Sequence, residues 1–323
     1  MSSIPESAQH SARSGPFFIV LNSASGHKDT NAEREVLADV FNSAGRSFKF
    51  LQFDNPQDIG RVSAQAVALA KEKNGVVVAA GGDGTINAVA AAVLRSGCPF
   101  GVLPQGTFNY FGRTHAIPQD ARAAATALLN ASISPVTVGE VNGRVFLVNA
   151  SLGLYPQLLE DREAWKQKFG RSRLVAFASG LATIFQARGQ LRLEIEMAGV
   201  TSILTTPTLF IGNNHLQLAQ VGIDTADADA VKHGELAAIA VAPTSNFALL
   251  GLLARGVIGR LGDADNIKSF SFRTLKVAMR SKRRVKVATD GEITWMTPPL
   301  VFQVANTPLL LMVPAPDDRA EVA

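Results

Sequence analysis

Residues 81–85, Gly-Gly-Asp-Gly-Thr, place three glycines and one carboxylate directly after the apolar run 76–80. The glycines allow a sharp turn and a close approach of the backbone to a ligand. Thr85 precedes the apolar run 86–94 and is a favourable cap for a helix that begins there. Free N–H groups at a helix start suit a phosphate, so the sequence predicts a phosphate site in this loop.

Asp83 is the residue of this loop that phosphate binding does not explain. A carboxylate beside a phosphate indicates either a ligand of a magnesium ion or an acceptor of a proton. The loop lacks the lysine of the P-loop motif and the spacing of the dinucleotide-binding motif. The alternative interpretation is a tight turn between a strand and a helix, with Asp83 solvated.

Length and composition are typical of a well-packed globular protein. The chain has 323 residues, enough for two domains, of which 47% are hydrophobic and 18% charged. The single cysteine, Cys98, excludes a disulfide framework and favours a reducing compartment. A net charge of +4 and a pI near 9.3 suit phosphates, anionic lipid or nucleic acid without choosing among them.

The sequence shows neither a signal peptide nor a membrane-spanning segment. Residues 1–15 are polar, and we expect them to form a disordered tail. The charge-free candidate for a membrane span, 174–187, is shorter than the ~20 residues that cross a bilayer. We therefore expect a cytoplasmic protein, soluble or bound peripherally at the inner face of the membrane.

The first part of the chain alternates between strand and helix patterns, which predicts a parallel sheet with helices on its faces. Ligands of such sheets bind beyond the carboxyl ends of the strands. Three loops rich in glycine or polar residues follow predicted strands at that edge. Strands are expected at 17–22, 48–53, 76–80 and 100–104, helices at 31–43, 57–73 and 86–95, and the loops at 22–26, 81–85 and 104–109.

After about residue 135 short apolar strands dominate, which predicts an all-β sandwich or an open barrel. Asn142-Gly143 is expected as the two-residue turn of a hairpin, and a long helix is expected at 158–188. We expect an α/β domain at 16–135, a β-rich domain at 136–304, and a final strand that is free to return to the first domain at about 305–315. The β-rich strands are expected at 191–197, 208–212, 235–241, 272–278, 285–288 and 300–304.

Four ordered motifs between residues 16 and 313 resemble the diacylglycerol kinase catalytic family, and in particular its soluble bacterial lipid kinases. The Gly-Gly-Asp-Gly-Thr loop is similar to the glycine motif of this family, of sphingosine kinases and, more distantly, of NAD kinases. Residues 22–26 resemble its Asn-Pro-x-Ser-Gly loop, with Ser23 in place of proline. Residues 104–113 resemble its Pro-x-Gly-Thr-x-Asn-Asp-x-Ala-Arg segment, and 289–292 resemble its late Asp-Gly-Glu motif.

The resemblance implies a nucleotide-binding α/β domain with a parallel sheet and an all-β sandwich-like domain for the lipid, with ATP and substrate between them. It implies transfer of the γ-phosphoryl group of ATP to a lipid hydroxyl, with Mg²⁺ as cofactor. Diacylglycerol is the first expectation, and a sphingoid base or ceramide is the alternative. The residues implied around ATP are Asn22, Ser23, Ala24, Ser25, Gly26, Gly81, Gly82, Asp83, Gly84, Thr85, Ile86, Asn87, Thr107 and Asn109.

Three carboxylates from two distant segments fit the chemistry of this reaction. A hydroxyl is a weak nucleophile and needs a proton acceptor, and a metal on the transferred phosphoryl group needs a carboxylate ligand. We expect Glu292 to accept the proton, Asp83 to serve the nucleotide and Mg²⁺, and Asp290 to orient groups or to bind metal. The resemblance to sphingosine kinases implies Asp83 as the base instead. Taken alone, Asp290-Gly291-Glu292 is equally well explained as a hairpin turn.

Two residues depart from the family pattern. Tyr110 stands where the family has Asp, and His233 stands where bacterial members often have Asp before Gly234. Both missing carboxylates are associated in the family with a structural Mg²⁺ site, so we expect that site to be absent. A neutral hydrogen-bonded pair of Tyr110 and His233 is one replacement, and a plain surface turn at His233 is the other interpretation.

Basic and apolar stretches bear on the partners. Residues 270–287 carry seven basic residues and no acidic one, which fits anionic phospholipid or the phosphates of ATP, or simply a solvated hairpin face. Residues 247–254 and Trp165 suit either a lipid interface or a core. Few aromatic residues accompany the basic ones, so nucleic acid is not expected. A homodimer is left open.

Other function classes fit less well. The chain lacks the later Gly-Ser-Thr-Ala-Tyr-type segment of NAD kinases and the Asp-rich catalytic loop of phosphofructokinases. A protein that binds nucleotide or lipid without turnover is the alternative of another class, suggested by Tyr110 and His233.

Overall fold

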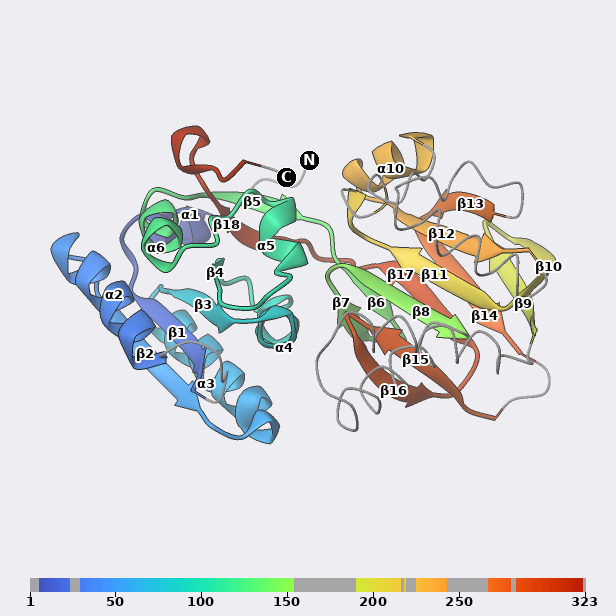
Figure 1. Cartoon of the computed structure of the whole chain (residues 1–323), viewed down its shortest axis with the longest axis horizontal. Coiled ribbons are helices and arrows are strands. Elements are labelled where there is room, and N and C mark those ends of the chain that lie inside the picture. Colours follow the sequence, from blue (N-terminus) through green and yellow to red (C-terminus); the bar gives the residue numbers. More distant parts are fainter. Residues whose placement is uncertain are drawn as a thin grey trace, which may run out of the picture. The chain divides into compact units, whose positions relative to one another are not determined.

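The structure is a computed structural model that describes residues 6–23, 30–153, 190–215, 218, 225–242, 267–279 and 283–321. The chain divides into two compact units (Figure 1). The first unit consists of Met1–Thr137 and Asn306–Ala323, and the second of Val138–Ala305. The change from alternating to β-rich sequence near residue 135 lies next to this division.

A six-stranded sheet with the order β2-β1-β3-β4-β18-β5 forms the centre of the first unit. Each of the first five strands in this order runs parallel to its neighbour, and only β5 runs antiparallel. The predicted parallel sheet is therefore confirmed, and the C-terminal strand returns to it. The bounds are β1 Phe17–Asn22, β2 Phe48–Phe53, β3 Val76–Gly81, β4 Phe100–Pro104, β5 Ser132–Val136 and β18 Leu309–Val313.

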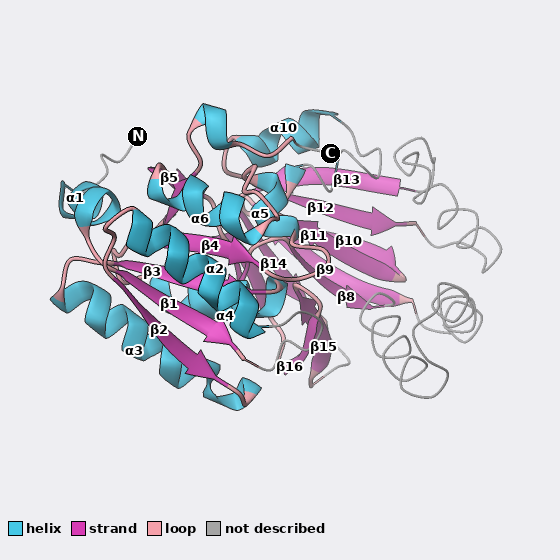
Figure 2. Cartoon of the chain, turned by 60° about the vertical axis from the view of Figure 1, so that its left-hand side comes forward, coloured by secondary structure: helices cyan, strands magenta, loops and turns pink. Residues whose placement is uncertain are grey.

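Helices cover both faces of this sheet (Figure 2). Successive strand residues point to opposite faces, so Phe17 and Ile19 reach one face, where they pack with Phe41 of α2 and Leu128 of α6. Helices α3 and α4 contact each other and β3. The bounds are α1 Glu6–Ser14, α2 Thr30–Ser43, α3 Ile59–Glu72, α4 Asp83–Val93, α5 Tyr110–Thr114 and α6 Ala121–Leu129, with short 3-10 turns η1 Pro56–Asp58 and η2 Pro316–Asp318.

The expectation of a disordered tail at residues 1–15 is wrong for helix α1. Ala8 and Ala12 of this helix are buried at 2% and 5% exposure. The side chain of Arg46 donates a 2.9 Å hydrogen bond to the carbonyl of Ala12 and stacks its guanidinium carbon 4.2 Å from the centroid of the Phe17 ring. Polar composition concealed this helix, because the side chains described as buried in it are those of two small residues, Ala8 and Ala12.

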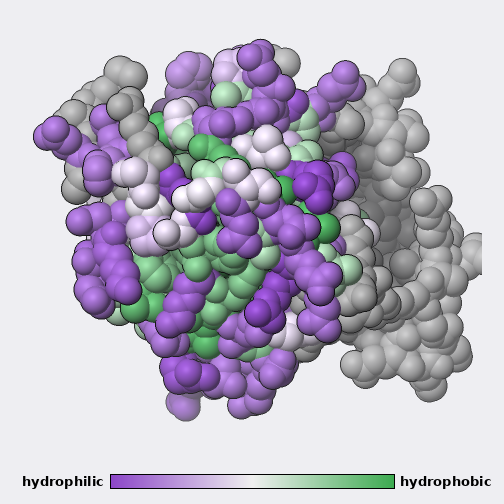
Figure 3. All heavy atoms as spheres, turned by 90° about the vertical axis from the view of Figure 1, so that its left-hand side faces the viewer, coloured by the Kyte–Doolittle hydropathy of each residue, from purple (hydrophilic) through white to green (hydrophobic). Residues whose placement is uncertain are grey.

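The edge strand β2 is protected along its free side. Phe48 and Phe50 are partly buried against the core, and Arg34 of α2 covers the Phe50 ring, with the guanidinium carbon 5.2 Å from the centroid. Seen from the left-hand side of Figure 1, the first unit shows apolar side chains gathered between hydrophilic ones (Figure 3). Lys49 is exposed on the same strand, and such a charge discourages pairing with another chain.

The second unit contains two six-stranded antiparallel sheets, with the orders β10-β9-β14-β17-β6-β7 and β13-β12-β11-β8-β15-β16. Side chains from both sheets share one core, which includes Phe146, Leu152, Leu275 and Val287. The predicted sandwich-like domain is confirmed. The bounds are β6 Gly139–Val141, β7 Arg144–Phe146, β8 Asn149–Gly153, β9 Leu191–Met197, β10 Val200–Thr206, β11 Thr208–Gly212, α10 Thr225–Lys232, β12 Leu236–Val241, β13 Ile267–Phe272, β14 Thr274–Ala278, β15 Val285–Thr289, β16 Glu292–Met296 and β17 Leu300–Val304.

The second unit differs from the sequence prediction in several elements. The turn at Asn142-Gly143 is confirmed, with Val141 opposite Arg144 and positive φ at both turn residues. Strands β10, β13 and β16 and helix α10 were not predicted. The predicted helix 158–188, with Trp165, and the apolar stretch 247–254 lie outside the described residues.

Candidate functional site

Helix α4 begins at Asp83, earlier than predicted, and Gly82 is its N-cap. The carbonyl of Gly82 accepts the first helical hydrogen bond, from the N–H of Ile86 at 3.0 Å. Thr85 is therefore not the cap but a buried residue of the first turn, with 7% exposure. A carboxylate at the first helical position lies at the positive end of the helix dipole, which stabilises its charge.

Neighbouring protein atoms require glycine at Gly81, before the helix, and at Gly106, in the loop after β4. A Cβ added to Gly81 would lie 2.7 Å from the Cβ of Thr85, and one added to Gly106 would lie 2.9 Å from the Cα of Gly82. The loops after β3 and β4 thus touch backbone to backbone. None of Gly81, Gly82 and Gly84 has a positive φ, so close approach rather than a left-handed turn explains Gly81.

The carboxylate of Asp83 joins these two loops. Its Oδ2 atom accepts a 3.0 Å hydrogen bond from the backbone N–H of Asn109, the N-cap of α5. Its Oδ1 atom is buried and has no hydrogen-bond partner in the described part of the chain. One oxygen of Asp83 is thus fixed by the protein, while the other is left with an acceptor site that a ligand can fill.

The environment of Asp83 opposes its ionisation. Burial raises the pKa of Asp83 above its ordinary value, and hydrogen bonds from the backbone of Asn109, Tyr110, Asp83 itself and Phe111 partly offset this by favouring the charged form. A buried carboxylate with a perturbed pKa and an unpaired oxygen is typical of a functional site. A nearby cation would lower this pKa again.

Asn109 is buried, at 3% exposure, and holds the loop after β4 together. Its Oδ1 atom accepts from the N–H of Gly106 at 2.9 Å, and its Nδ2 atom donates to the carbonyl of Gly106 at 2.8 Å and to Oε1 of Gln119 at 2.7 Å. Both amide protons are therefore in use. The structure assigns the Asn109 side chain to positioning this loop and leaves it no donor for a nucleotide.

The other residues implied around ATP fall into three groups. Thr107 and Gly84 are exposed, and Asn22, Ser23 and Asn87 are partly exposed at the carboxyl edge of the sheet. Ile86 is fully buried, so its side chain belongs to the core and not to a nucleotide site. Ala24, Ser25 and Gly26 lie outside the described residues.

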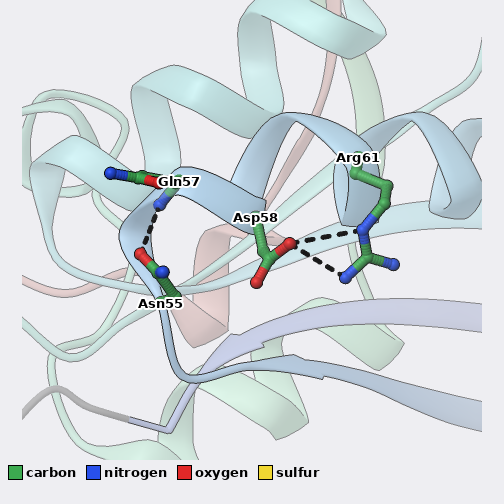
Figure 4. A network of polar contacts seen from close by, with 4 residues as sticks. All are labelled: Asn55, Gln57, Asp58 and Arg61. Atoms are coloured by element: carbon green, nitrogen blue, oxygen red, sulfur yellow. Dashed lines mark hydrogen bonds and ion pairs between the residues drawn. The ribbon is translucent and has the colours of Figure 1, made fainter.

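The loop after β2, at the same edge of the sheet, is closed by its own side chains (Figure 4). Asn55 Oδ1 accepts a 3.0 Å hydrogen bond from the backbone N–H of Gln57. Asp58 pairs with Arg61 at 3.1 Å, and both side chains are largely exposed. This carboxylate is already paired and solvated, unlike that of Asp83.

The two residues that depart from the family pattern have contacts within their own units. Tyr110 is 37% exposed and stacks on Phe108, with centroids 5.6 Å apart and the rings 2° from parallel. His233 is exposed at the end of α10, with Nδ1 2.7 Å from the carbonyl oxygen of Asp229. These contacts explain the orientation of both rings, and the absence of a structural metal stays a prediction.

In the second unit the carboxylate of Asp290 organises a stretch of backbone. Its Oδ2 atom accepts from the N–H of Leu147 at 2.7 Å, and Oδ1 accepts from those of Val148 and Asn149 at 2.9 Å each. Asp290 itself adopts a left-handed conformation, with φ of 46°. Of the two roles expected for Asp290, orientation is therefore the one that has contacts in the structure.

Glu292 is held by an arginine that the sequence analysis did not identify. Arg144 donates from Nη2 to Glu292 Oε2 at 2.8 Å and from Nε to the buried Thr289 Oγ1 at 2.9 Å. The side chain of Glu292 is 63% exposed. The ion pair with Arg144 orients an accessible carboxylate.

Part of the basic block is described. Arg283 and Arg284 are exposed, and Lys276 forms a 3.0 Å ion pair with Glu196. The Lys286 ammonium lies 5.3 Å from the centroid of the Trp295 ring, and Trp295 is 52% exposed. Arg280 and Lys282 lie outside the described residues.

The donor set of the first unit fits a magnesium ion that is bound largely by its nucleotide. Mg²⁺ commonly takes one or two protein carboxylates and completes its coordination with phosphates and water. Asp83 Oδ1 is a buried oxygen of the required kind without a partner among the described residues. The three N–H donors on Asp290 make that carboxylate a poorer ligand.

Sequence reasoning assigned no role to Arg144, Thr289, Gln119 and Gln105, although Thr289 and Gln105 lie within the motifs at 289–292 and 104–113. Gln105 Oε1 is a second buried acceptor without a partner in the described chain, beside a backbone N–H that donates to Gly81 O at 2.9 Å. Arg144 and Glu292 are far apart in the sequence although their side chains are in contact. Only the hairpin turn before Arg144 gave a sequence signal for its position. Gln119 has no local signal.

Residues 16–141 match the family model of the diacylglycerol kinase catalytic domain. A probable YegS-like lipid kinase of Pseudomonas aeruginosa is 35% identical over 130 residues, which are 40% of this chain and 42% of that protein. A diacylglycerol kinase of Staphylococcus aureus is 28% identical over 234 residues, which are 68% and 73% of the two chains.

A crystal structure of a diacylglycerol kinase from Bacillus anthracis has a TM-score of 0.67 at 18% identity and covers 94% of this chain and 97% of that one. It shows a common fold. The chain spans about half the length of several curated relatives that it matches, at 57%, 42% and 41%.

None of the helices in the described part of the chain is long and apolar enough to cross a membrane.

The motif resemblance is confirmed for the first unit, because the matched range contains the glycine loop, Asp83 and Asn109. By sequence, residues 16–141 are similar to the catalytic domain of diacylglycerol kinases.

Proposed function

We propose that this protein is an ATP-dependent lipid kinase that transfers the γ-phosphoryl group to a lipid hydroxyl, with diacylglycerol as the acceptor. A sphingoid base or ceramide is the alternative acceptor. The observation that carries the proposal is the carboxylate of Asp83, fixed through one oxygen and unpaired at the other, within a segment that matches the diacylglycerol kinase family.

The first unit supplies the nucleotide site in this proposal. The exposed loop residues Gly84 and Thr107 border the start of α4, whose N–H groups suit phosphate oxygens. Asp83 Oδ1 serves the cation that accompanies ATP. When bound, Mg²⁺ neutralises charge on the phosphate oxygens and so favours transfer.

The second unit supplies the proton acceptor. Glu292 is oriented by Arg144 and stays exposed in this ion pair. Its carboxylate is therefore accessible to accept the proton of the attacking hydroxyl. Asp290 and Thr289 act indirectly. Asp290 fixes the neighbouring backbone, and Thr289 fixes Arg144, which holds Glu292. Removal of a general base lowers a rate by about 10²–10⁴-fold.

The first experiment measures transfer from ATP radiolabelled on its γ-phosphate to dispersed diacylglycerol, sphingosine, ceramide and non-lipid alcohols. Asp83→Asn is expected to lower kcat/KM by about a hundredfold or more. Asp58→Asn is the matched control, since it removes a paired, exposed carboxylate at the same sheet edge. Labelling of a non-lipid acceptor alone would refute the substrate class.

The second experiment separates the two carboxylates by ATP binding, measured calorimetrically with and without Mg²⁺. Asp83→Asn is expected to remove the gain in affinity that Mg²⁺ confers. Glu292→Gln is expected to keep that gain and to lose transfer, while Glu196→Gln, the matched exposed and lysine-paired carboxylate, changes neither. Wild-type binding of ATP without transfer to any acceptor would favour a nucleotide-binding protein without turnover.

We also propose that the protein meets its lipid at an anionic, cytoplasmic membrane surface. Arg283 and Arg284 are exposed, and each well-placed basic residue contributes about 1 kcal/mol on anionic lipid. Sedimentation with vesicles containing phosphatidylglycerol tests this against vesicles of phosphatidylcholine alone. The variant Arg283→Gln/Arg284→Gln should lose the difference, and equal binding to both vesicles would contradict an electrostatic contact.

A further inference from the structure

An exposed tryptophan lies on the hairpin that carries the candidate base. Strands β15 and β16 pair across the turn at Asp290 and Gly291, and Trp295 of β16 lies opposite Lys286 of β15 (Figure 1). Trp295 is 52% exposed, which makes it one of five exposed large apolar residues in the described chain. Tryptophan combines a large apolar ring with an N–H donor, so its exposed ring suits a boundary between apolar and polar surroundings.

The side chain of Trp295 points away from the sandwich core. Its strand neighbour Met296 and the opposite residue Val285 pack in that core. Successive residues of a strand point to opposite faces, so Trp295 and Lys286 share the outer face of the sheet. There the Lys286 ammonium lies 5.3 Å from the centroid of the Trp295 ring, and this cation–π contact holds the ring and a positive charge together.

The hairpin presents positive charge to the solvent because its acidic residues are already engaged. Asp290 accepts three backbone N–H groups, and Glu292 is paired with Arg144. Arg283 and Arg284 are exposed just before β15, and they add to the charge of the lysine beside the tryptophan. A tryptophan and basic residues on one hairpin suit an anionic bilayer, because the ring enters the headgroup boundary while the cations stay with the phosphates.

We propose that the β15–β16 hairpin docks on an anionic bilayer, with the Trp295 ring at the boundary of headgroups and acyl chains and Lys286 beside lipid phosphates. The docking rests on the proposed function, in which the acceptor is a lipid whose hydroxyl lies at that boundary. Glu292 precedes Trp295 by three residues, about 10 Å along a strand, and the headgroup layer is about 5–8 Å thick. A hairpin anchored through Trp295 therefore keeps the candidate base near the depth of the acceptor hydroxyl.

Tryptophan fluorescence tests the contact directly, because the chain has two tryptophans, Trp165 and Trp295. The full chain with Trp165→Phe reports Trp295 alone. On vesicles of phosphatidylcholine with phosphatidylglycerol, we expect its emission to shift to shorter wavelength. We also expect the strongest quenching from lipid that is brominated near the headgroup end of the acyl chain. If Trp165→Phe does not fold, the difference between wild type and Trp295→Phe gives the same signal.

Partition of the protein between buffer and the anionic vesicles measures the strength of the contact. Trp295→Ala is expected to lower the partition coefficient about tenfold, and Lys286→Gln about fivefold. Two matched controls should change it by less than about twofold. Val200→Ala removes an exposed apolar side chain elsewhere in the second unit, and Lys268→Gln removes an exposed lysine of the same sheet. Circular dichroism checks that every variant is folded.

Transfer to diacylglycerol separates the docking from the reaction itself. The rate with diacylglycerol in vesicles, relative to the rate with a short-chain diacylglycerol in solution, should fall about tenfold in Trp295→Ala. An emission of Trp295 that anionic vesicles leave unchanged refutes the docking, as does an equal shift on vesicles of phosphatidylcholine alone. Equal partition of Trp295→Ala and wild type also refutes it. A wild type that phosphorylates neither acceptor refutes the proposed function instead, and the fluorescence then still decides the docking.

Discussion

The carboxylate of Asp290 offers the sharpest test of how the second unit holds its candidate base. Three buried residues, Leu147, Val148 and Asn149, donate their backbone N–H groups to it at 2.7–2.9 Å. Replacing Asp290 by alanine leaves all three donors without this acceptor. The stretch they belong to leads into strand β8, so we predict that it loosens locally before the sandwich unfolds.

The magnitude follows from the bonds. A hydrogen bond to a charged group contributes about 1.5–3 kcal/mol, but bonds that share one acceptor are not additive. We expect Asp290→Ala to lower the free energy of unfolding by about 3–5 kcal/mol. Alanine also keeps the left-handed backbone at a cost of about 1 kcal/mol, which glycine avoids. Asparagine keeps one acceptor oxygen and should lose about 1–2 kcal/mol.

The assay must report on the second unit alone, because a chain of two units need not unfold in one step. Hydrogen exchange followed by mass spectrometry measures the opening free energy of peptides that contain residues 147–149. Calorimetry gives the overall transition. Asp120→Ala is the control, since it removes one cap bond, from Ala123 N–H at 3.0 Å, and should cost about 1 kcal/mol in the first unit.

We expect the loss of stability at position 290 to increase in the order Asn, Gly, Ala, and we expect Asp290→Ala to lose the protection of residues 147–149 from exchange. Equal effects of all three substitutions would show that the carboxylate is not the acceptor that matters. Unchanged exchange at 147–149 in Asp290→Ala would also refute it. A loss no larger than that of Asp120→Ala would show that the three bonds contribute little.

Three further predictions follow from the site. Gly106→Ala should lower the free energy of unfolding by about 1–3 kcal/mol, because its Cβ would lie 2.6 Å from Asn109 Oδ1. Gly60→Ala in α3, where the added Cβ meets open space, should instead raise the free energy of unfolding by about 0.5–1 kcal/mol. Chemical denaturation measures both changes. The pKa of Asp83 is raised in the folded state, so the contribution of Asp83 to the free energy of unfolding is most favourable below the ordinary pKa near 3.8 and is lost as pH rises through the folded pKa. Asp83→Asn should therefore be no less stable than wild type at neutral pH, and should lose that advantage in acid. Melting curves measured across pH test this. Arg144→Gln should lower the transfer rate about tenfold or more while leaving ATP affinity unchanged, and a fall in affinity alone would contradict its role in aiming the carboxylate.

Strands β1 to β4 and helices α2 to α4 of the first unit were predictable because their patterns are local, whereas α1, α5, α6 and β5 were not predicted. Strands β1, β2 and β4 have the expected bounds. Strands β1 and β4 are the apolar runs that buried parallel strands require, whereas the edge strand β2 carries exposed Lys49 and Gln52. Helix α1 was missed because the residues described as buried in it, Ala8 and Ala12, are small and give a weak hydrophobic signal. The start of α4 was displaced because Thr85 looks like a cap, although the chain is already helical at Asp83.

The second unit was less predictable because its pairing is long-range. Strand β10 is rich in threonine and serine and has little apolar alternation, and β16 follows an Asp-Gly turn that equally suits a functional motif. The contact of Arg144 with Glu292 depends on β7 and β16, which lie in different sheets. A motif identifies Glu292, but only the folded sandwich identifies what holds it.

The glycine loop shows why a motif and its contacts must be considered together. The sequence explains Asp83 by a ligand alone, whereas the structure divides its carboxylate, with Oδ2 on the Asn109 backbone and Oδ1 unpaired. Asp83→Ala would remove both functions at once and mix loss of the loop with loss of the ligand. Asp83→Asn retains an acceptor oxygen for Asn109 and removes the charge, so a folded but inactive Asn variant isolates the contribution of the charge to the reaction.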